Sequence, residues 1–153
     1  MTQTPPSVPP ETAARNRAAH QFIAALPHCA ALSMQVEEVA AGVAVISMPW
    51  SPDLVGDPAT GVIHGGAISA LMDTCGGAAV LCHPTAPLST ATMDLRIDYM
   101  RAANPRQRIT ARATCHHVTR SVAFVRAEAF DEDGEGPVAV ANGAFTLDRG
   151  ASA

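Results

Sequence analysis

The chain has no lysine, few aromatic residues and no long apolar run, and each of these shortages narrows its possible functions. All ten of its basic residues are arginine, aromatic residues make up 4%, and the net charge at pH 7 is −4. A nucleic-acid-binding surface needs clustered positive charge, so this charge balance argues against one. No stretch approaches the roughly 18 uninterrupted apolar residues of a transmembrane helix. We therefore expect neither a nucleic-acid partner nor a membrane partner.

The four cysteines follow no pattern that indicates a disulfide. Cys75 and Cys82 lie on one predicted helix, but about two turns separate them, which is too far to form a bond. The N-terminal residues MTQTPPSVPPET are polar and proline-rich and lack the apolar segment of a signal peptide. These features predict free thiols in a reducing compartment, and hence a cytoplasmic protein.

The length and composition predict one globular domain. Of the 153 residues, 48% are hydrophobic and 16% are charged, which is typical of a folded chain. Residues 1–10 contain four prolines and are expected to form a flexible tail. The single domain is predicted over residues 11–148, and residues 149–153 are predicted to be a flexible C-terminus.

Hydrophobic periodicity divides this domain into helices and strands. A short amphipathic helix is expected over residues 11–26, ending at Pro27. Its apolar stripe consists of Ala14, Ala18, Phe22 and Ala25. The other predicted elements are two strands around a turn near residues 40–42, a loop over 51–61, a long helix over 65–83 closed by Pro84, and strands over 89–100, 108–118, 121–131 and 137–147.

The strands are expected to form one curved sheet. Residues 109–116 alternate apolar and polar side chains, which is the pattern of a sheet with one covered face. Short connections between the last four strands favour an antiparallel meander. The 65–83 helix is the only element apolar enough to cover the sheet. The predicted fold class is α+β, with a long helix packed on about six antiparallel strands and a short N-terminal helix.

The long helix has two distinct faces. The stripe assigned to the sheet consists of Ile68, Leu71, Cys75, Ala78 and Cys82. The other stripe is made of small residues around one acid: Gly66, Ser69, Asp73, Gly76 or Gly77, and Val80. A glycine inside a helix costs about 1 kcal/mol of helix stability relative to alanine. Two adjacent glycines are therefore expected where a ligand or a neighbouring backbone must come close to the helix. A solvated acid beside a glycine kink is the alternative interpretation.

The start of this helix, His64-Gly65-Gly66, is a candidate binding site. The first N–H groups of a helix have no helical acceptor and attract negative charge. Glycine allows a substrate atom to approach the backbone there, and the Gly65 N–H is predicted to polarise a carbonyl and stabilise an oxyanion. His64 is predicted either to orient or donate to the substrate, or to make a structural hydrogen bond.

The spacing of Asp73 and Gly65 has a consequence for assembly. Eight residues of helix separate them by about 12 Å along the axis. An acid and an oxyanion donor of one site must each lie about 3 Å from the reacting carbon. If both belong to one site, Asp73 must therefore meet Gly65 of a second chain across two antiparallel helices. The spacing predicts a two-fold homodimer with two equivalent sites.

The stretch VGDPATGVIHGGAISALMDTCGGAAV, followed by TATMDLRIDYMRAA, resembles the hotdog-fold acyl-CoA thioesterases of the phenylacetate-degradation (PaaI-like) family. The resemblance covers residues 27–147. Its specific part is H-G-G, then L-x-D on the helix, then T-x-D-L-x-x-x-Y-x-R on a strand. It implies a hotdog fold, dimers paired into a homotetramer, active sites across the dimer interface, and acyl-CoA as substrate with no separate cofactor.

The same resemblance assigns roles to individual residues. The oxyanion glycine of the family falls on Gly65, its histidine on His64, and its nucleophile or general base on Asp73. A hydroxyl that helps to position water in some members falls on Thr92.

Two further positions are less well matched. Some relatives carry Asn or Gln six residues before the histidine, where this chain has Pro58 with Asp57 beside it. Asp57 is predicted to bind substrate from this loop. Arg120, in the H-V-T-R-S turn, occupies a place where relatives often carry a basic residue near the nucleotide. A solvated turn arginine is the alternative interpretation of Arg120.

The predicted reaction is hydrolysis of an acyl-CoA thioester, with Asp73 either attacking the carbonyl carbon or removing a proton from water. A hotdog dehydratase or hydratase and a non-catalytic acyl-CoA-binding protein are the alternatives. No metal site is expected, because His116 and His117 are neighbours on a strand and face opposite sides. The sequence does not indicate which acyl group is preferred.

Overall fold

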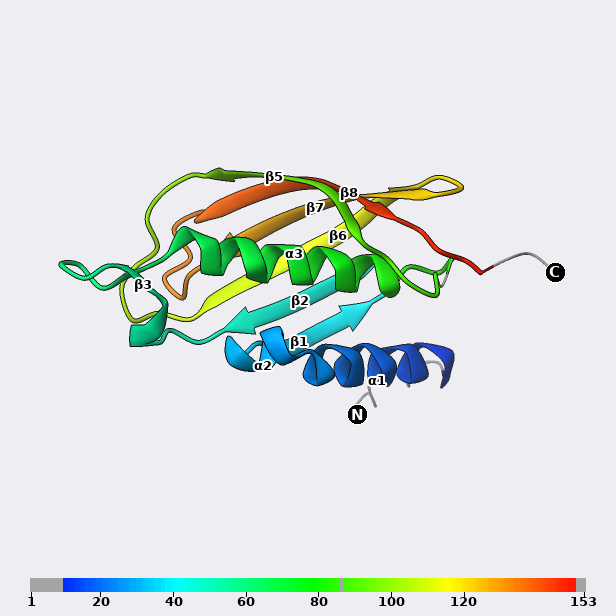
Figure 1. The fold of residues 1–153 in the computed structure, drawn as a ribbon, viewed down its shortest axis with the longest axis horizontal. Helices are drawn as coiled ribbons and strands as arrows, with labels where there is room; N and C mark the ends of the chain where they lie inside the picture. The colour runs from blue at the N-terminus through cyan, green and yellow to red at the C-terminus, as the bar shows by residue number, and fades with distance from the viewer. Residues whose placement is uncertain (1–9, 86, 151–153) are drawn as a thin grey trace, which may run out of the picture.

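The computed structural model describes residues 10–85 and 87–150. A six-stranded antiparallel sheet carries one long helix across a face, and two N-terminal helices lie beside its first strand (Figure 1). Residues 1–9 and 151–153, where most of the two predicted flexible ends fall, lie outside the described residues. Pro10 was assigned to the N-terminal tail, but it is the first residue of a helix.

The elements follow the predicted order. The helices are α1 Pro10–Ala25, α2 Pro27–Ala31, the 3-10 turn η1 Pro52–Leu54 and α3 Gly65–Leu81. The strands are β1 Gln35–Ala40, β2 Val43–Met48, β3 Val55–Asp57, β4 Val62–Ile63, β5 Thr92–Tyr99, β6 Ile109–Val118, β7 Val122–Phe130 and β8 Ala139–Thr146. None of the described helices is long and apolar enough to cross a membrane.

The strand order corrects the predicted meander. The sheet runs β1-β2-β6-β7-β8-β5, so β6, β7 and β8 form a meander but β5 pairs with β8 at the far edge. The chain between β5 and β6, residues 100–108, must cross three strand spacings, about 14 Å. Nine residues can span roughly 30 Å, so this short connection is still long enough to pass two strands. Connection length alone therefore did not determine strand adjacency.

The segment over residues 51–61 is more ordered than the predicted loop. β3 and β4 form a small antiparallel ribbon, and the Trp50 indole Nε1 donates to the Gly61 carbonyl at 2.9 Å. Gly61 has a φ of +76°, a conformation that favours glycine. The turn between β3 and β4 thus closes on its own hydrogen bonds, and the ribbon leads directly into α3.

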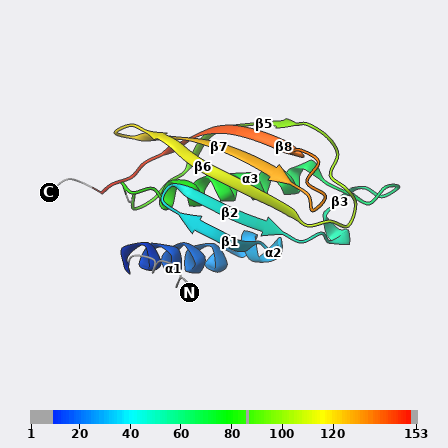
Figure 2. The same ribbon diagram turned by 180° about the vertical axis from the view of Figure 1, so that it is seen from behind.

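Helix α3 lies along one face of the sheet, in front of it in Figure 1, and packs mainly against β2, β6 and β7. Every member of the predicted sheet-facing stripe is buried, and Leu71 and Cys75 are fully inaccessible to solvent. Val80, which was assigned to the other stripe, is also fully buried and belongs to the core. From behind, no described helix covers the opposite face of the sheet (Figure 2).

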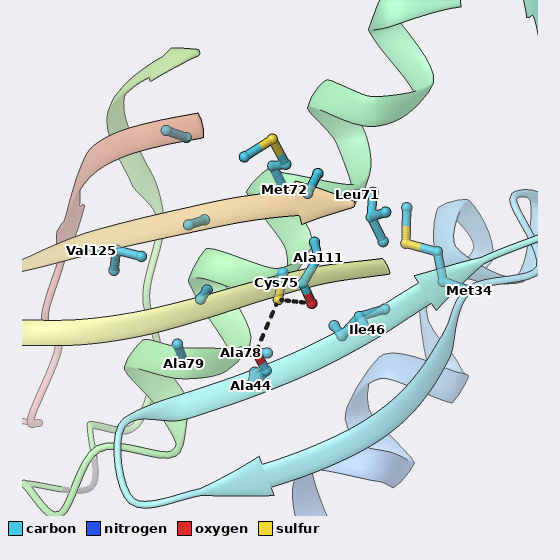
Figure 3. Packing of buried hydrophobic residues seen from close by; sticks show 14 of the residues in the cluster. Met34, Ala44, Ile46, Leu71, Met72, Cys75, Ala78, Ala79, Ala111 and Val125 are labelled. Atoms are coloured by element: carbon cyan, nitrogen blue, oxygen red, sulfur yellow. Dashed lines mark hydrogen bonds between the residues drawn. The ribbon is translucent and has the colours of Figure 1, made fainter. Parts of the chain in front are cut away.

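The thiol of Cys75 is part of the core packing between α3 and the sheet. It donates to the carbonyl of Ala44 on β2 at 3.3 Å and to that of Ala111 on β6 at 3.4 Å (Figure 3). Burial raises the pKa of the Cys75 thiol to about 12. The thiol therefore stays protonated, and it serves as a small buried donor.

Helix α1 buries a different face from the predicted one. Ala19 and Ile23 are buried, whereas Phe22, from the predicted apolar stripe, is 49% exposed. An alanine-rich helix offers apolar side chains in several directions, so contact with the rest of the fold decides which face is covered. Here the branched side chain of Ile23 faces the core. Phe22 is left at the edge of a cavity described below.

Candidate active site

His64 caps the N-terminus of α3. Its backbone is extended, with φ −66° and ψ 135°, and its ring Nδ1 accepts a hydrogen bond from the Gly66 N–H at 2.8 Å. Because Nδ1 is an acceptor, the proton of the neutral ring lies on Nε2, which remains a donor. A side chain on Gly66 would place its Cβ 2.8 Å from His64 Nδ1, so glycine makes this cap possible.

The β3–β4 ribbon holds His64 in place. The His64 N–H donates to the Leu54 carbonyl at 2.7 Å. A Cβ on Gly56 of β3 would lie 2.8 Å from the His64 Cα, so the ribbon packs directly against the backbone of this residue. The Gly66 N–H is engaged in the cap, and the predicted part of Gly66 in binding substrate stays a prediction.

The N–H of Gly65, the residue before Gly66, is free: no hydrogen bond within residues 10–85 and 87–150 engages it. The Tyr99 hydroxyl, at the end of β5, donates to the Gly65 carbonyl at 2.7 Å and lies 2.5 Å from the Ser69 hydroxyl. A Cβ on Gly65 would lie 3.3 Å from the Tyr99 ring. The first turn of α3 thus presents one unpaired donor beside an aromatic ring.

Asp73 lies two turns further along α3 and is half-buried. The Thr92 hydroxyl, at the start of β5, donates to Asp73 Oδ1 at 2.6 Å. This bond joins the predicted acid to the predicted helper hydroxyl, although 19 residues separate them in the chain. It holds one carboxylate oxygen and leaves lone pairs on the other oxygen, Oδ2, for a further partner.

The two glycines after Asp73 have different surroundings. A Cβ on Gly76 would lie 2.7 Å from the Phe145 ring, so Gly76 packs against the sheet. A Cβ on Gly77 would approach only the Thr90 methyl group, at 4.0 Å. The helical spacing had left open whether Gly76 or Gly77 shares the face of Asp73. These surroundings assign Gly77 to that face.

Asp57 stabilises its own turn. Its carboxylate accepts hydrogen bonds from the Thr60 hydroxyl at 2.7 Å and from the Ala59 N–H at 3.0 Å. These hydrogen bonds lower the pKa of the Asp57 carboxyl, the one from the Thr60 hydroxyl more than the one from the Ala59 N–H. Pro58 occupies the tip of this turn, between β3 and β4. These contacts give Asp57 a structural role, and its predicted part in binding substrate stays a prediction.

The structure does not join Arg120 to the other candidate residues. Arg120 is exposed in the turn between β6 and β7. Within the described residues, no hydrogen bond or ion pair links Arg120 to Gly65, Asp73 or Thr92. Its predicted contact with a nucleotide stays a prediction. The same residues contain no group of three or more His, Cys, Asp or Glu side chains suited to a metal ion.

Tyr99 and Ser69 were not assigned a role from the sequence. Tyr99 is the tyrosine of the T-x-D-L-x-x-x-Y-x-R motif, and its spacing from Thr92 places the two at opposite ends of β5. Because β5 runs along α3, its two ends reach the helix at Asp73 and at Gly65. The seven-residue spacing of Thr92 and Tyr99 along one predicted strand was therefore the sequence feature that could have indicated a role for Tyr99.

Comparisons with known proteins find relatives in both sequence and structure. Residues 60–138 match the family model described as the thioesterase superfamily. The medium/long-chain acyl-CoA thioesterase YigI of Escherichia coli K12 is 30% identical over 125 residues, covering 73% of this chain and 80% of YigI.

Solved structures show the same architecture. A Pseudomonas aeruginosa protein is 38% identical, with a TM-score of 0.77 over 86% of this chain and 98% of that protein. The phenylacetic acid degradation protein PaaI of Thermus thermophilus, solved as a mutant, is 28% identical, with a TM-score of 0.70 over 80% of this chain and 99% of PaaI.

Proposed function

Because the chain belongs to the thioesterase superfamily, as a PaaI-like member with the hotdog fold, it is a thioester hydrolase, and we propose that it hydrolyses acyl-CoA at sites shared by two copies of the chain. One observation carries this proposal. A carboxylate bound by a hydroxyl and an unpaired helix N–H lie on the same continuous helix, about 12 Å apart along its axis. No single chain can bring both groups to one carbonyl.

In the proposed reaction, the Gly65 N–H of one chain binds the thioester oxygen. The positive end of α3 supports this bond, which strengthens as negative charge develops on the oxygen. Tyr99 fixes the first turn through the Gly65 carbonyl, so the donor is held in place before substrate arrives. His64 Nε2–H is a second donor at the same end of the helix.

Asp73 of the other chain supplies the reactive carboxylate. In one route its oxygen attacks the thioester carbon, the C–S bond breaks and CoA leaves as the thiolate. Water then hydrolyses the mixed anhydride, which regenerates the Asp73 carboxylate and releases the proton that the thiolate takes up. In the other route Asp73 takes a proton from a water molecule that attacks the same carbon, and the proton passes to the CoA sulfur as the C–S bond breaks. Both routes end in free acid and CoA, and Thr92 orients the carboxylate in each.

The edge of the sheet supports a two-chain site. β5 is the outermost strand on its side, so one row of its backbone groups is unpaired within the described residues. Exposed large apolar side chains also gather on and around this strand: Leu88, Met93, Tyr99 and Met100. An edge strand with apolar neighbours pairs readily with its own copy, and such pairing brings the two α3 helices side by side. The homotetramer implied by the resemblance stays part of this proposal.

The rival functions differ in what they release. A hydratase would add water across a carbon–carbon double bond and leave the thioester intact, and a binding protein would bind acyl-CoA without turnover. The contact between Thr92 and a half-buried Asp73 favours a catalytic carboxylate over either, because an unused partly buried acid is a burden on folding.

The test is a panel of aliphatic and aryl acyl-CoA substrates with release of free CoA as the readout, for the wild type and for Asp73→Asn. The asparagine keeps the shape of the side chain and can still accept the hydrogen bond from Thr92. We expect CoA release from the wild type and a loss of about 10²–10⁴-fold in kcat/KM for Asp73→Asn. The same change from carboxylate to amide at exposed Glu132, as Glu132→Gln, is the control. Full hydrolysis by Asp73→Asn would exclude the assigned acid.

A further inference from the structure

A cavity of about 500 Å³ opens beside the candidate acid, between α1, α3 and the segment before β5. Its volume falls within the range of about 300–1,000 Å³ that is usual for small-molecule sites. Asp73 and Thr92 both line it, so the carboxylate and its hydroxyl partner form part of its wall. Whatever occupies the cavity is therefore in contact with the proposed reaction centre.

The lining separates into a polar part and an apolar part. The polar side chains come from residues 73–74 and 89–92, next to the acid. The apolar part is a wall formed by α1 and the residue that follows it. Every residue that lines this wall is apolar: Ala18, Ala19, Phe22, Ile23 and Leu26. An apolar wall opposite an acid fits a hydrocarbon group attached to the carbon on which the acid acts.

We infer that this cavity holds the acyl chain of the substrate and that α1 sets the length of chain accepted. The inference rests on the proposed function and deepens it: the chain that supplies Asp73 also binds the acyl group, while its partner supplies the Gly65 amide. Because α1 presents no polar side chain to the cavity, the favoured acyl groups are aliphatic and lack polar substituents at the far end.

Phe22 is the first of two positions that limit the length of the cavity available to an acyl chain. It is 49% exposed, which is unusual for a large aromatic side chain, and it lines the cavity. Helix α1 lies outside the residues 60–138 that match the family model. Removing the Phe22 ring would enlarge the cavity without opening the core.

Gly77 is the second position. It lies one turn beyond Asp73 on the same face of α3 and lines the cavity. A Cβ there would approach only the Thr90 methyl group, at 4.0 Å, so a larger side chain can extend only into open space. Glycine thus keeps the cavity deep at the point where an acyl chain would leave the acid.

The test measures kcat/KM for a series from butyryl-CoA to palmitoyl-CoA in the wild type, Gly77→Leu and Phe22→Ala. For Gly77→Leu we expect the ratio of decanoyl-CoA to butyryl-CoA to fall by about tenfold or more, because a few methylenes lose their site. For Phe22→Ala we expect the preference to move towards longer chains. Gln21→Ala, an exposed neighbour on α1 outside the lining, is the control and should keep the wild-type profile. The mass of each variant in solution verifies its assembly.

Calorimetry with the non-hydrolysable thioether S-decyl-CoA makes the test independent of catalysis. Gly77→Leu should weaken binding of S-decyl-CoA about tenfold or more and leave that of CoA unchanged. If the wild type releases CoA but both variants keep its chain-length profile and its S-decyl-CoA affinity, the acyl site is overturned and the proposed hydrolysis stands. If the wild type releases no CoA but Gly77→Leu selectively weakens S-decyl-CoA binding, the proposed function fails and the acyl site stands.

Discussion

The Thr92 hydroxyl donates to Asp73 Oδ1 at 2.6 Å and joins the start of β5 to the middle of α3. A hydrogen bond to a carboxylate contributes more than one between neutral groups, and it fixes the direction in which the second oxygen points. The acid is thereby held ready on the face of the helix that carries Gly77 and the cavity.

Removing this hydroxyl should lower catalysis more than stability. For Thr92→Val, which keeps the shape but loses the donor, we expect kcat to fall about 10–100-fold, equivalent to roughly 1.5–3 kcal/mol. Thr92→Ser, which keeps the hydroxyl, should stay within a few-fold of the wild type. Steady-state kinetics with one acyl-CoA measures both variants. Equal losses in the two would contradict a role for the hydroxyl.

The N–H of Gly65 can be deleted by a single substitution. Proline is accepted at the first position of a helix, and the extended backbone of His64, with ψ 135°, suits a residue before proline. Gly65→Pro should therefore fold and lose about 10²–10³-fold in kcat, which is the usual effect of losing one oxyanion donor.

Gly65→Ala is the matched control for that variant. It adds a Cβ 3.3 Å from the exposed Tyr99 ring, as proline also does, but it keeps the N–H. We expect it to retain most of the activity. If Gly65→Ala and Gly65→Pro lose the same activity, crowding against Tyr99 explains the loss and the N–H is not the donor.

Gly76 should tolerate no side chain, in contrast to its neighbour on the cavity side. A Cβ at this position would lie 2.7 Å from Phe145 Cζ, and Phe145 is almost completely buried. We expect Gly76→Ala to destabilise the fold by about 1–3 kcal/mol in urea unfolding. Phe145→Leu removes the ring, so the double variant should cost less than the sum of the single changes. Simple additivity would mean that the two residues do not crowd each other.

A partly buried ion pair between Arg101 and Asp131 should give the stability of the protein a distinct acid dependence. Arg101 donates two hydrogen bonds of 2.7 Å to the buried Asp131 carboxylate, and these lower the pKa of Asp131 to about 2. Because the folded pKa lies below the unfolded one, the stabilisation is present above about pH 4 and is lost as the pH falls towards 2. It amounts to about 2 kcal/mol.

The variant Asp131→Asn isolates this contribution. At neutral pH it should be less stable than the wild type by about 3 kcal/mol, because Arg101 loses its charged partner. The difference should shrink when urea unfolding is repeated between pH 4 and pH 2, where the wild type loses the same interaction. A difference that stays constant over this range would contradict the assigned pKa.

Local patterns predicted most of the elements. Alternation along β6 and the apolar stripe of α3 indicated correctly which side chains are buried, because both patterns follow directly from strand and helix geometry. The 12 Å spacing of Gly65 and Asp73 needed only the rise of a helix. The proximity of Thr92 to Asp73 rested on the family resemblance, since no local pattern relates β5 to the middle of α3.

The remaining features depend on contacts between distant segments. The position of β5 beside β8 follows from how the sheet closes around α3, which connection length does not specify. The buried face of α1 is chosen by Ile23, although several of its faces are apolar. Tyr99 reaches Gly65 only because β5 runs along the helix. Each of these required the assembled fold.

The shared active site is tested most directly by combining two inactive variants. Asp73→Asn and Gly65→Pro, each inactive as a homodimer, are co-expressed at equal levels. In a mixed dimer one site carries both lesions and the other carries neither, so random pairing should restore about a quarter of the wild-type CoA release. If acid and amide acted within one chain, every site would carry one lesion. The mixture would then stay as inactive as its parents, and that result would contradict a site built from two chains.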